Sequence, residues 1–370
     1  MKTDIKLNTI PVLTWTWLKM NCAFTDENLT SDISFKNGEV KFISKPLSVN
    51  LISSDKFKTS LPAPLSAVFA KTSELGIQYK SVNESSVFFN ESNAETTVIE
   101  ATQKESEPVL LSVKADGNTV TNQIIHALPN SEVTVIILCE SENESGVNLI
   151  RTKCYAEENA KIHLCKVQLL PDGFYHIDST ENVCGENAKI EFTELQLGAK
   201  DIYTGVHTNL SEYKASYKSD TAYYRKQNQS IDMNYVCCHS HEGKKTECSM
   251  AVAGTLKDEA KKTYRGTIDF KKGCSGSKGN ETEETLLLSP KAVNRSVPII
   301  LCDEEDVEGE HGATIGRLSD DVLFYMQSHG ISEDEACALM AEAKINAVKA
   351  KITHAYVQEK LEKFISEMLK

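Results

Sequence analysis

Several common signatures are missing from this chain of 370 residues. No Cys-x-x-Cys occurs among its 11 cysteines, so the sequence gives no support for a zinc ribbon, a thioredoxin-like site or a ferredoxin-type cluster motif. The phosphate-binding patterns Gly-x-x-x-x-Gly-Lys-Ser/Thr and Gly-x-Gly-x-x-Gly and the nucleophile pattern Gly-x-Ser-x-Gly are absent too. A function that consumes ATP must therefore borrow the ATPase of a partner.

Positive charge and long apolar runs are also scarce. The formal net charge is −13, which argues against nucleic acid or an anionic membrane as a partner, because both reward a basic face. No apolar run approaches the ~20 residues that span a bilayer. Residues 1–20 carry Lys2, Asp4 and Lys6 and contain no uninterrupted apolar core of the kind found in a secretory signal. We therefore expect a cytoplasmic protein whose scattered cysteines are reduced and mostly act as small buried hydrophobes.

What the chain does have is an internal repeat. The residues Glu158–Ile162 recur as Glu186–Ile190, 28 residues later, and Gln168-Leu169 recurs as Gln196-Leu197 at the same offset. Short runs that alternate between apolar and polar residues surround both copies, which is the pattern of a strand with two different faces. These predicted strands are Val133–Leu138, Leu149–Tyr155, Ile162–Leu169, Tyr175–Val183, Ile190–Leu197, Tyr203–Leu210, Ile231–Cys237, Glu247–Val252 and Tyr264–Phe270. One gap of 28 residues between strand starts leaves room for a further strand.

Two folds compete for this pattern. An antiparallel sandwich also shows short strands at regular intervals. The spacing here is longer and more even, however, and the repeat falls at every second strand, as one coil of a solenoid with two main faces requires. We therefore predict a mainly β fold, a right-handed parallel β-helix over residues 111–316, preceded by an N-terminal region (1–110). That region has less regular strand candidates, among them Val40–Ile43, Ser86–Phe89 and Val109–Val113.

Helical signals replace the alternation after residue 316, which predicts a C-terminal helical domain over residues 317–370. Ser319 precedes two acids and Gly330 follows, so they are suited to begin and end a first helix. Ser332 and Glu335 have the spacing of a capping box for a second helix. A third stretch carries apolar residues at helical spacing between Val357 and Met368. We expect these helices to pack on one another and to cap the open end of the solenoid.

Metal-ligating side chains gather near residue 240. Cys237, His239 and His241 alternate along one predicted strand, and Cys248 lies near the next. Sulfur and imidazole ligands suit zinc or iron. Side chains at i and i+2 on an extended strand are ~7 Å apart, however, so they need help from other strands to share a metal. The alternative is that Cys237 belongs to the core and the histidines flank a turn.

The most informative segment is Cys302–Arg317. Six acidic residues and His311 lead into the small residues Gly312, Ala313 and Gly316, directly before the first predicted helix. With the run Leu286–Ser289 upstream and Leu323–Tyr325 downstream, this pattern resembles the SufB/SufD family of iron–sulfur cluster assembly scaffolds.

Two departures favour the SufD side of that family. SufB members carry a sulfur-accepting cysteine just ahead of their equivalent of Leu286-Leu287-Leu288, where this chain has Glu283 and no thiol. They also have His-Glu where this chain has His311-Gly312. Ile10–Met20, with its proline and tryptophans, resembles the motif that opens many SufD-like chains.

The resemblance implies a β-helix between helical parts and a scaffold that is not itself an enzyme. It implies a transient iron–sulfur cluster at His311, for which Glu308, Glu310 and Cys302 are further candidates. A SufC-like ABC ATPase is expected on the C-terminal helices, where Leu323, Phe324, Tyr325 and Leu339 are candidate contacts. The second expected partner is a SufB-like subunit.

Two other functions stay open at this point. One is a SufB-like self-dimer that works with SufC, and the other is a β-helix carbohydrate-active enzyme. The sequence does not decide whether a flavin binds.

Overall fold

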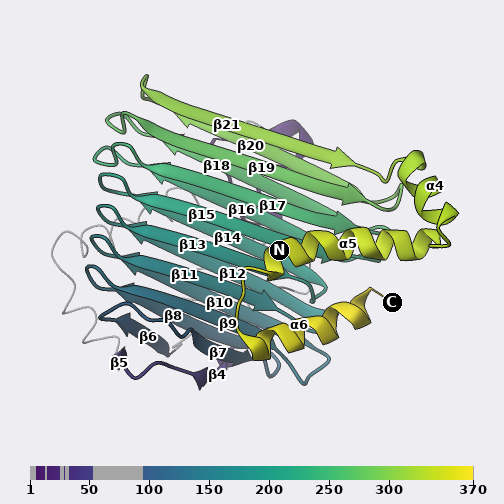
Figure 1. The fold of residues 1–370 in the computed structure, drawn as a ribbon, viewed down its shortest axis with the longest axis horizontal. Coiled ribbons are helices and arrows are strands. Elements are labelled where there is room, and N and C mark those ends of the chain that lie inside the picture. Colours follow the sequence, from purple (N-terminus) through teal and green to yellow (C-terminus); the bar gives the residue numbers. More distant parts are fainter. Residues whose placement is uncertain (1–5, 13–14, 26–28, 30–32, 53–94, 370) are drawn as a thin grey trace.

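The computed structural model describes residues 6–12, 15–25, 29, 33–52 and 95–369, and the predicted strand Ser86–Phe89 lies outside them. Most of the described chain forms two stacked, twisted sheets whose strands alternate along the sequence (Figure 1).

We call the two sheets the even and the odd sheet, after the numbers of most of their strands. The even sheet consists of β3 (Lys36–Asn37), β5 (Val49–Ile52), β6 (Thr96–Ala101), β8 (Thr119–Ala127), β10 (Ser145–Ala156), β12 (Gly173–Cys184), β14 (Asp201–Leu210), β16 (Ser230–His239), β18 (Lys261–Phe270) and β20 (Val293–Cys302). The odd sheet consists of β4 (Glu39–Ser44), β7 (Val109–Lys114), β9 (Glu132–Glu140), β11 (Lys161–Gln168), β13 (Lys189–Gln196), β15 (Ser216–Arg225), β17 (Glu247–Leu256), β19 (Ser277–Leu287) and β21 (Val307–Gly316).

The predicted solenoid is confirmed. From β6 and β7 to β20 and β21, every strand pairs in parallel with the strand two places along the chain. Ile162 pairs with Ile190, so the 28-residue repeat corresponds to one coil. The gap in the predicted strands holds β15. Within the described parts of these two sheets, the antiparallel pairs lie at the start, where β4 joins β7 and β5 joins β6. A separate two-stranded sheet pairs β1 (Lys6–Leu7) with β2 (Ala23–Phe24), also antiparallel.

The repeated Glu-Asn-Ala sequence forms the turn between the two sheets. Asn159 and Asn187 have φ of 57° and 53°, in the left-handed region that asparagine tolerates better than most residues. Asn130 has the same conformation one coil earlier, with φ of 63°. Each turn then delivers an alanine or serine and the first residue of the next strand to the same place, which keeps the coils in register.

The three C-terminal helices are those that the sequence predicts. They are α4 (Asp320–Ser328), α5 (Glu333–Lys349) and α6 (Ala355–Met368). The Ser319 side chain caps α4, and Ser332 and Glu335 form the capping box of α5. Gly330 follows α4 with φ of 83°, which suits a residue without a Cβ atom. None of these helices is long and apolar enough to cross a membrane.

The prediction that the helices cap the end of the solenoid is wrong. The helices α5 and α6 lie across the outer face of the odd sheet, as the yellow ribbons in Figure 1 show. The reason is that several outward-facing positions of this sheet are apolar. Cys165, Val167, Leu195 and Leu197 pack there against residues such as Ile345 and Leu361 of the two helices. Covering this broad apolar face removes more apolar area from water than covering the polar last coil would.

An N-terminal segment lies against the outer face of the even sheet. Ile10 and Met20 pack against Val297 of β20. The Asn8 side chain donates a hydrogen bond to Asp232 (2.7 Å), and Arg265 Nε donates one to the carbonyl of Met20 (2.7 Å). The outer faces of both sheets are thus partly covered, whereas the edge beyond β20 and β21 is not covered by any described residue (Figure 1).

Candidate functional site

The last coil is the most exposed part of the solenoid. In β21 every residue from Glu308 to Gly316 is exposed, although strands in the middle coils are largely buried. Within the described residues, no strand pairs with the outer edge of β20 or β21. Their free N–H and C=O groups and their inward-facing side chains are therefore open to a partner.

His311 faces the interior of the solenoid at this open end. Because register pairs stack directly, the line through His311 runs back through all the coils. We call this line the central column: Val135, Leu164, Phe192, Ser219, Met250, Glu281 and His311. The six residues of this column from Val135 to Glu281 are buried, and His311 is exposed because no described coil follows it. The interior of the fold thus comes to the surface at this histidine.

Glu281, the residue beneath His311, is the titratable group that the sequence reasoning missed. It lies on β19 and is only 3% exposed. Burial raises the pKa of Glu281 to about 7, with a further contribution from the charge of Glu283, while Lys262 acts in the opposite direction. A carboxyl group that exchanges a proton near neutral pH therefore lies directly behind the exposed imidazole.

A buried ion pair lies two residues further along the same strand. Lys262 of β18 donates to Glu283, and neither side chain is accessible to water. Ser296 of β20 also donates to Glu283, as does Thr285 at 3.2 Å. Burial lowers the pKa of Lys262 to about 8. Glu283 is thus held by an internal network of hydrogen bonds.

Similar polar groups continue deeper between the sheets. Lys166 pairs with Asp178 at 2.5 Å, and Tyr235 donates to Glu194. Tyr223 and Thr285 hydrogen-bond at 2.9 Å, which joins the middle coils to the network around Glu283. Buried polar groups therefore line the interior from the coil of β11 and β12 to the open end.

The structure does not bring Glu308, Glu310 and Cys302 together with His311. Glu308 and Glu310 alternate with His311 on β21 and so face the outer side of the odd sheet, where Glu308 pairs with Lys278 at 2.9 Å. Cys302 ends β20 on the inward line above Phe270, beside the loop. His311 lies four residues into β21, roughly 13 Å along the strand from that loop.

Two of the remaining acids of this segment have a local structural role. Glu304 accepts a hydrogen bond from the backbone N–H of Gly273 (2.7 Å), and Asp306 accepts one from the Ser275 hydroxyl (2.6 Å). Both bonds tie the loop between β20 and β21 to the loop one coil below.

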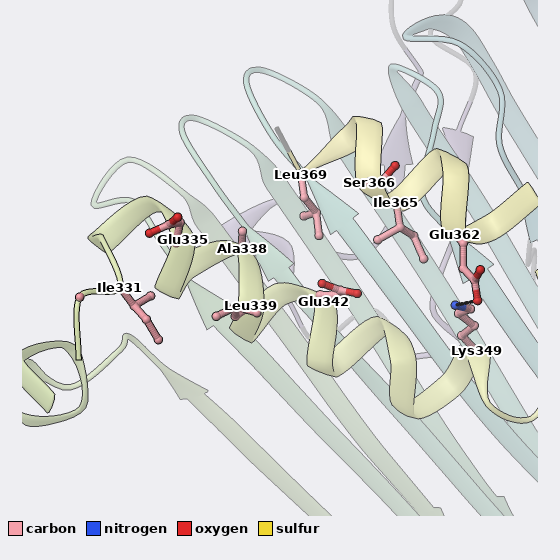
Figure 2. Close-up of a pocket in the computed structure, with 11 residues that line it drawn as sticks. Ile331, Glu335, Ala338, Leu339, Glu342, Lys349, Glu362, Ile365, Ser366 and Leu369 are labelled. Atoms are coloured by element: carbon pink, nitrogen blue, oxygen red, sulfur yellow. Dashed lines mark hydrogen bonds and ion pairs between the residues drawn. The ribbon is translucent and has the colours of Figure 1, made fainter. Parts of the chain in front are cut away.

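The candidate partner contacts lie on a surface without a covering element. The helix α4 has no buried residue, and Phe324 and Tyr325 are 74% and 65% exposed, while Leu323 is half-buried. Leu339 of α5 is also exposed and lines a groove of about 590 Å³ between α5 and α6 (Figure 2). Lys349 and Glu362 bridge the groove at 3.2 Å.

Three of the four metal-ligating residues near residue 240 lie close together in the structure. Side-chain atoms of Cys237, His239 and Cys248 lie within 4.8 Å of one another. Cys237 and His239 are two residues apart on β16, and the third ligand, Cys248, comes from β17 of the other sheet. The neighbouring side chains of Cys237 and His239 lower the pKa of Cys248 to about 6, whereas burial raises the pKa of Cys237. His241 is exposed and bonds to the Lys272 carbonyl instead.

A signal for the missed residues exists in the sequence. Glu281, Glu283 and Thr285 alternate on β19, so three polar residues share one face of the strand. On β11 and β13 the inward face is likewise polar in its second half, at Lys166 and Glu194, so β19 differs in being polar along most of this face. The pattern indicates a polar interior, but only once the inward face of the strand is known.

Comparisons with known proteins fit this geometry. The family model described as "SUF system FeS cluster assembly, SufBD core domain" matches residues 109–344. The chain is 27% identical over 217 residues to the iron–sulfur cluster assembly protein SufD of Bacillus subtilis, which covers 58% of this chain and 49% of that protein. It is 27% identical to a SufBD family iron–sulfur cluster assembly protein of Pyrococcus horikoshii over 233 residues, which cover 55% of this chain and 52% of that protein.

SufB of Bacillus subtilis is 24% identical over 195 residues, which cover 52% of this chain and 41% of SufB. The chain spans about half the length of the curated relatives it matches.

Proposed function

Because this chain belongs to the SufBD core family of the SUF system, we propose that it is a SufD-like scaffold subunit that helps to assemble iron–sulfur clusters at the open end of its solenoid. The cluster is the cargo of this reaction and the protein is not an enzyme in its own right. The observation that carries the proposal is the position of His311, which is exposed at the end of the described solenoid where the edge strands β20 and β21 belong to a parallel coil, whereas the other end finishes with the antiparallel strands β4 and β5.

His311 needs ligands from a second subunit. Iron–sulfur clusters are held mainly by thiolates, and one imidazole does not hold a cluster by itself. Cys302 lies near the loop rather than beside His311, and the position closest to the SufB thiol is the buried Glu283. A SufB-like partner that brings its own sulfur-accepting cysteine supplies what this chain lacks.

The edges of the last coil offer the means of pairing. A strand of the partner can add to the free edge of β20 or β21 through main-chain hydrogen bonds. Ile300 and Ile315, which face inward from these two strands, are 37% and 47% exposed and would be buried by such a partner. A second copy of this chain fits the same edges, so a self-dimer is the alternative, although it would contain no thiol at the Glu283 position.

A SufC-like ABC ATPase is proposed to dock on α4 and the adjacent end of α5. Phe324, Tyr325 and Leu339 are large, exposed and apolar or aromatic, while the buried faces of α5 and α6 already pack on the odd sheet. The complex is proposed to work in the cytoplasm, where its thiols stay reduced.

Co-expression tests the assembly. The chain is expressed with a SufB-like subunit and a SufC-like ATPase, and the complex is followed through size-exclusion chromatography. We expect all three proteins to co-elute. Ile300→Asp with Ile315→Asp should release the SufB-like subunit, and Phe324→Asp should release only the ATPase.

Circular dichroism checks that both variants remain folded. If the folded Ile300→Asp, Ile315→Asp variant keeps the SufB-like subunit, the open end is not the interface. If the wild-type chain elutes alone or as a self-dimer in the presence of both partners, the proposed heteromeric complex is wrong.

A further inference from the structure

A second cluster of potential ligands lies away from the open end, inside the coil formed by β16 and β17. Cys237 and His239 come from β16 of the even sheet, and Cys248 comes from β17 of the odd sheet. Their three ligand atoms lie within 4.8 Å of one another, and their side chains are 0%, 0% and 5% exposed. No second group of this kind occurs in the described part of the chain.

The ring of His239 is oriented as that of a metal ligand. Its Nδ1 lies 2.6 Å from the Thr246 hydroxyl, which in turn donates to the carbonyl of Gly243 at 3.0 Å. In the tautomer that lets this hydroxyl donate to the Gly243 carbonyl or to the Ser277 hydroxyl (2.9 Å), Nδ1 carries the ring proton and donates it to Thr246 Oγ1. The lone pair is then on Nε2.

Nothing in the described chain uses that lone pair. His239 Nε2 is buried and has no hydrogen-bond partner. The ring is held on its other side by Phe270, with centroids 4.6 Å apart and planes at 19°. Buried polar atoms are nearly always paired, so an unpaired nitrogen beside two thiols indicates a missing ligand. A metal ligand whose other nitrogen donates to a fixed acceptor is the usual arrangement for histidine.

We propose that Cys237, His239 and Cys248 bind one zinc ion. On binding, each thiol loses its proton to solvent, so two thiolates and one neutral imidazole surround the ion. The charge of the two thiolates cancels that of Zn²⁺, which matters in a site removed from water. Cu⁺ would leave an uncompensated negative charge, and Fe²⁺ binds such ligands more weakly than Zn²⁺ does.

The geometry needs only a small adjustment. Zinc binds sulfur at about 2.3 Å and nitrogen at about 2.0 Å, so ligand atoms around one tetrahedral ion lie about 3.5 to 3.8 Å apart. Side chains whose ligand atoms are within 4.8 Å reach these distances by small rotations. A water molecule completes the fourth position, as in other sites with two cysteines and one histidine.

The site is distinct from the cluster-assembly site in position and purpose. It lies beneath the coils that contain β18 to β21, so a partner's thiolates do not reach it. It joins one strand of the even sheet to one of the odd sheet across the turn of residues 240–246. Zinc at this point would fasten the two sheets together shortly before the exposed last coils.

The test uses the full chain alone, without iron or partners. The purified, reduced chain is treated with chelator and then titrated with Co²⁺, whose bonds to thiolates give charge-transfer absorption in the near ultraviolet. We expect one Co²⁺ per chain, displaced by one Zn²⁺, and elemental analysis of the zinc form to agree. Cys248→Ser should abolish the thiolate absorption, whereas Cys154→Ser, a control at an equally buried cysteine of the same core, should retain it.

Thr246 provides a second, independent variant. Thr246→Val removes the acceptor that orients His239, and we expect metal affinity to fall about 10- to 100-fold, while Thr246→Ser restores it. If Cys248→Ser does not fold, X-ray absorption at the zinc edge of the wild-type chain still reports whether sulfur and nitrogen neighbours surround the ion.

Three results would overturn the proposal: a reduced wild-type chain that binds neither metal, thiolate absorption that survives Cys248→Ser, or a zinc environment without sulfur. A disulfide between Cys237 and Cys248 in place of the metal, found by peptide mapping of the reduced preparation, would overturn it as well. None of these results bears on His311, because the experiment contains no iron, sulfide or partner.

Discussion

The middle coils and the last coil are built from the same repeat, yet they differ in what lies beyond them. In β13, Phe192 has a neighbouring coil on both sides and is 1% exposed. In β21, His311 occupies the same column and faces the same way, but it has a coil on one side only. A position in the repeat that is part of the core thus becomes part of a surface when the repeat stops.

The composition of the two regions follows that difference. A buried position between two coils favours an apolar side chain, because burial without a hydrogen-bond partner is costly for polar groups. The middle coils also bury some polar groups, such as Lys166, which is paired with Asp178. The last coil differs because its inward-facing His311 is exposed, which suits a surface that works with a partner.

The largest expected effect separates a middle position of the central column from its exposed end. Phe192→Ala leaves a cavity between coils and should lower the free energy of unfolding by about 3–5 kcal/mol. His311→Ala removes an exposed side chain and should change it by less than about 0.5 kcal/mol. Urea unfolding followed by circular dichroism measures both. If the two variants lose similar amounts of unfolding free energy, His311 is a structural residue and the difference between the middle coils and the last coil disappears.

A second contrast lies in the helices. Ile345 of α5 is 1% exposed against the odd sheet, so Ile345→Ala should cost about 2–5 kcal/mol. Phe324 of α4 is exposed, so Phe324→Ala should change stability by less than about 0.5 kcal/mol. The same unfolding experiment applies. A large loss from Phe324→Ala would mean that α4 is held by the fold and is not free for a partner.

The pH dependence of Glu281 should give the next effect. Its folded pKa of about 7 lies above its ordinary value of 4.5, so the folded state holds this proton more tightly than the unfolded state. The favourable contribution is complete below pH 4.5 and is lost as the pH rises to 7. The loss amounts to about 3 kcal/mol. Glu281→Gln has no such proton to lose.

The measurement compares the wild-type chain and Glu281→Gln by urea unfolding at pH 5 and pH 8. Other carboxylates affect both proteins alike and cancel in the difference. The variant should gain stability relative to the wild type between the two pH values. An unchanged difference would mean that the folded-state pKa of Glu281 is not raised to about 7.

The fold was largely predictable because the sequence pattern of one coil recurs in the next coil. The offset between the repeated residues Glu158–Ile162 and Glu186–Ile190 gives the length of one coil. The pairing of Ile162 with Ile190 follows directly from this offset. The end of the repeat was harder to interpret. The apolar side chains that hold α5 and α6 alternate with the core residues of β11 and β13, so the strands are apolar on both faces and do not reveal which outer face the helices cover.

For the candidate site, the sequence predicts which residues are present but not which of them lie together. His311 stood out by its neighbours, and the structure places it at the free end. Glu308 and Glu310 looked equivalent in the sequence, but alternation along β21 turns them to the other side of the sheet. Glu281 is 30 residues away from His311 in the chain and becomes its neighbour only through the coil, so no local pattern connects the two.

The most direct test of the central claim measures cluster assembly in a reconstituted complex. The chain is combined with a SufB-like subunit, a SufC-like ATPase, iron and a sulfur source, and the cluster is followed by its visible absorption. His311→Ala should retain folding and both partners but lose most of the cluster yield, whereas Cys302→Ser, the matched control on the same coil, should lose little. A normal yield from His311→Ala together with a loss from Cys302→Ser would contradict the account and assign the site to the thiol.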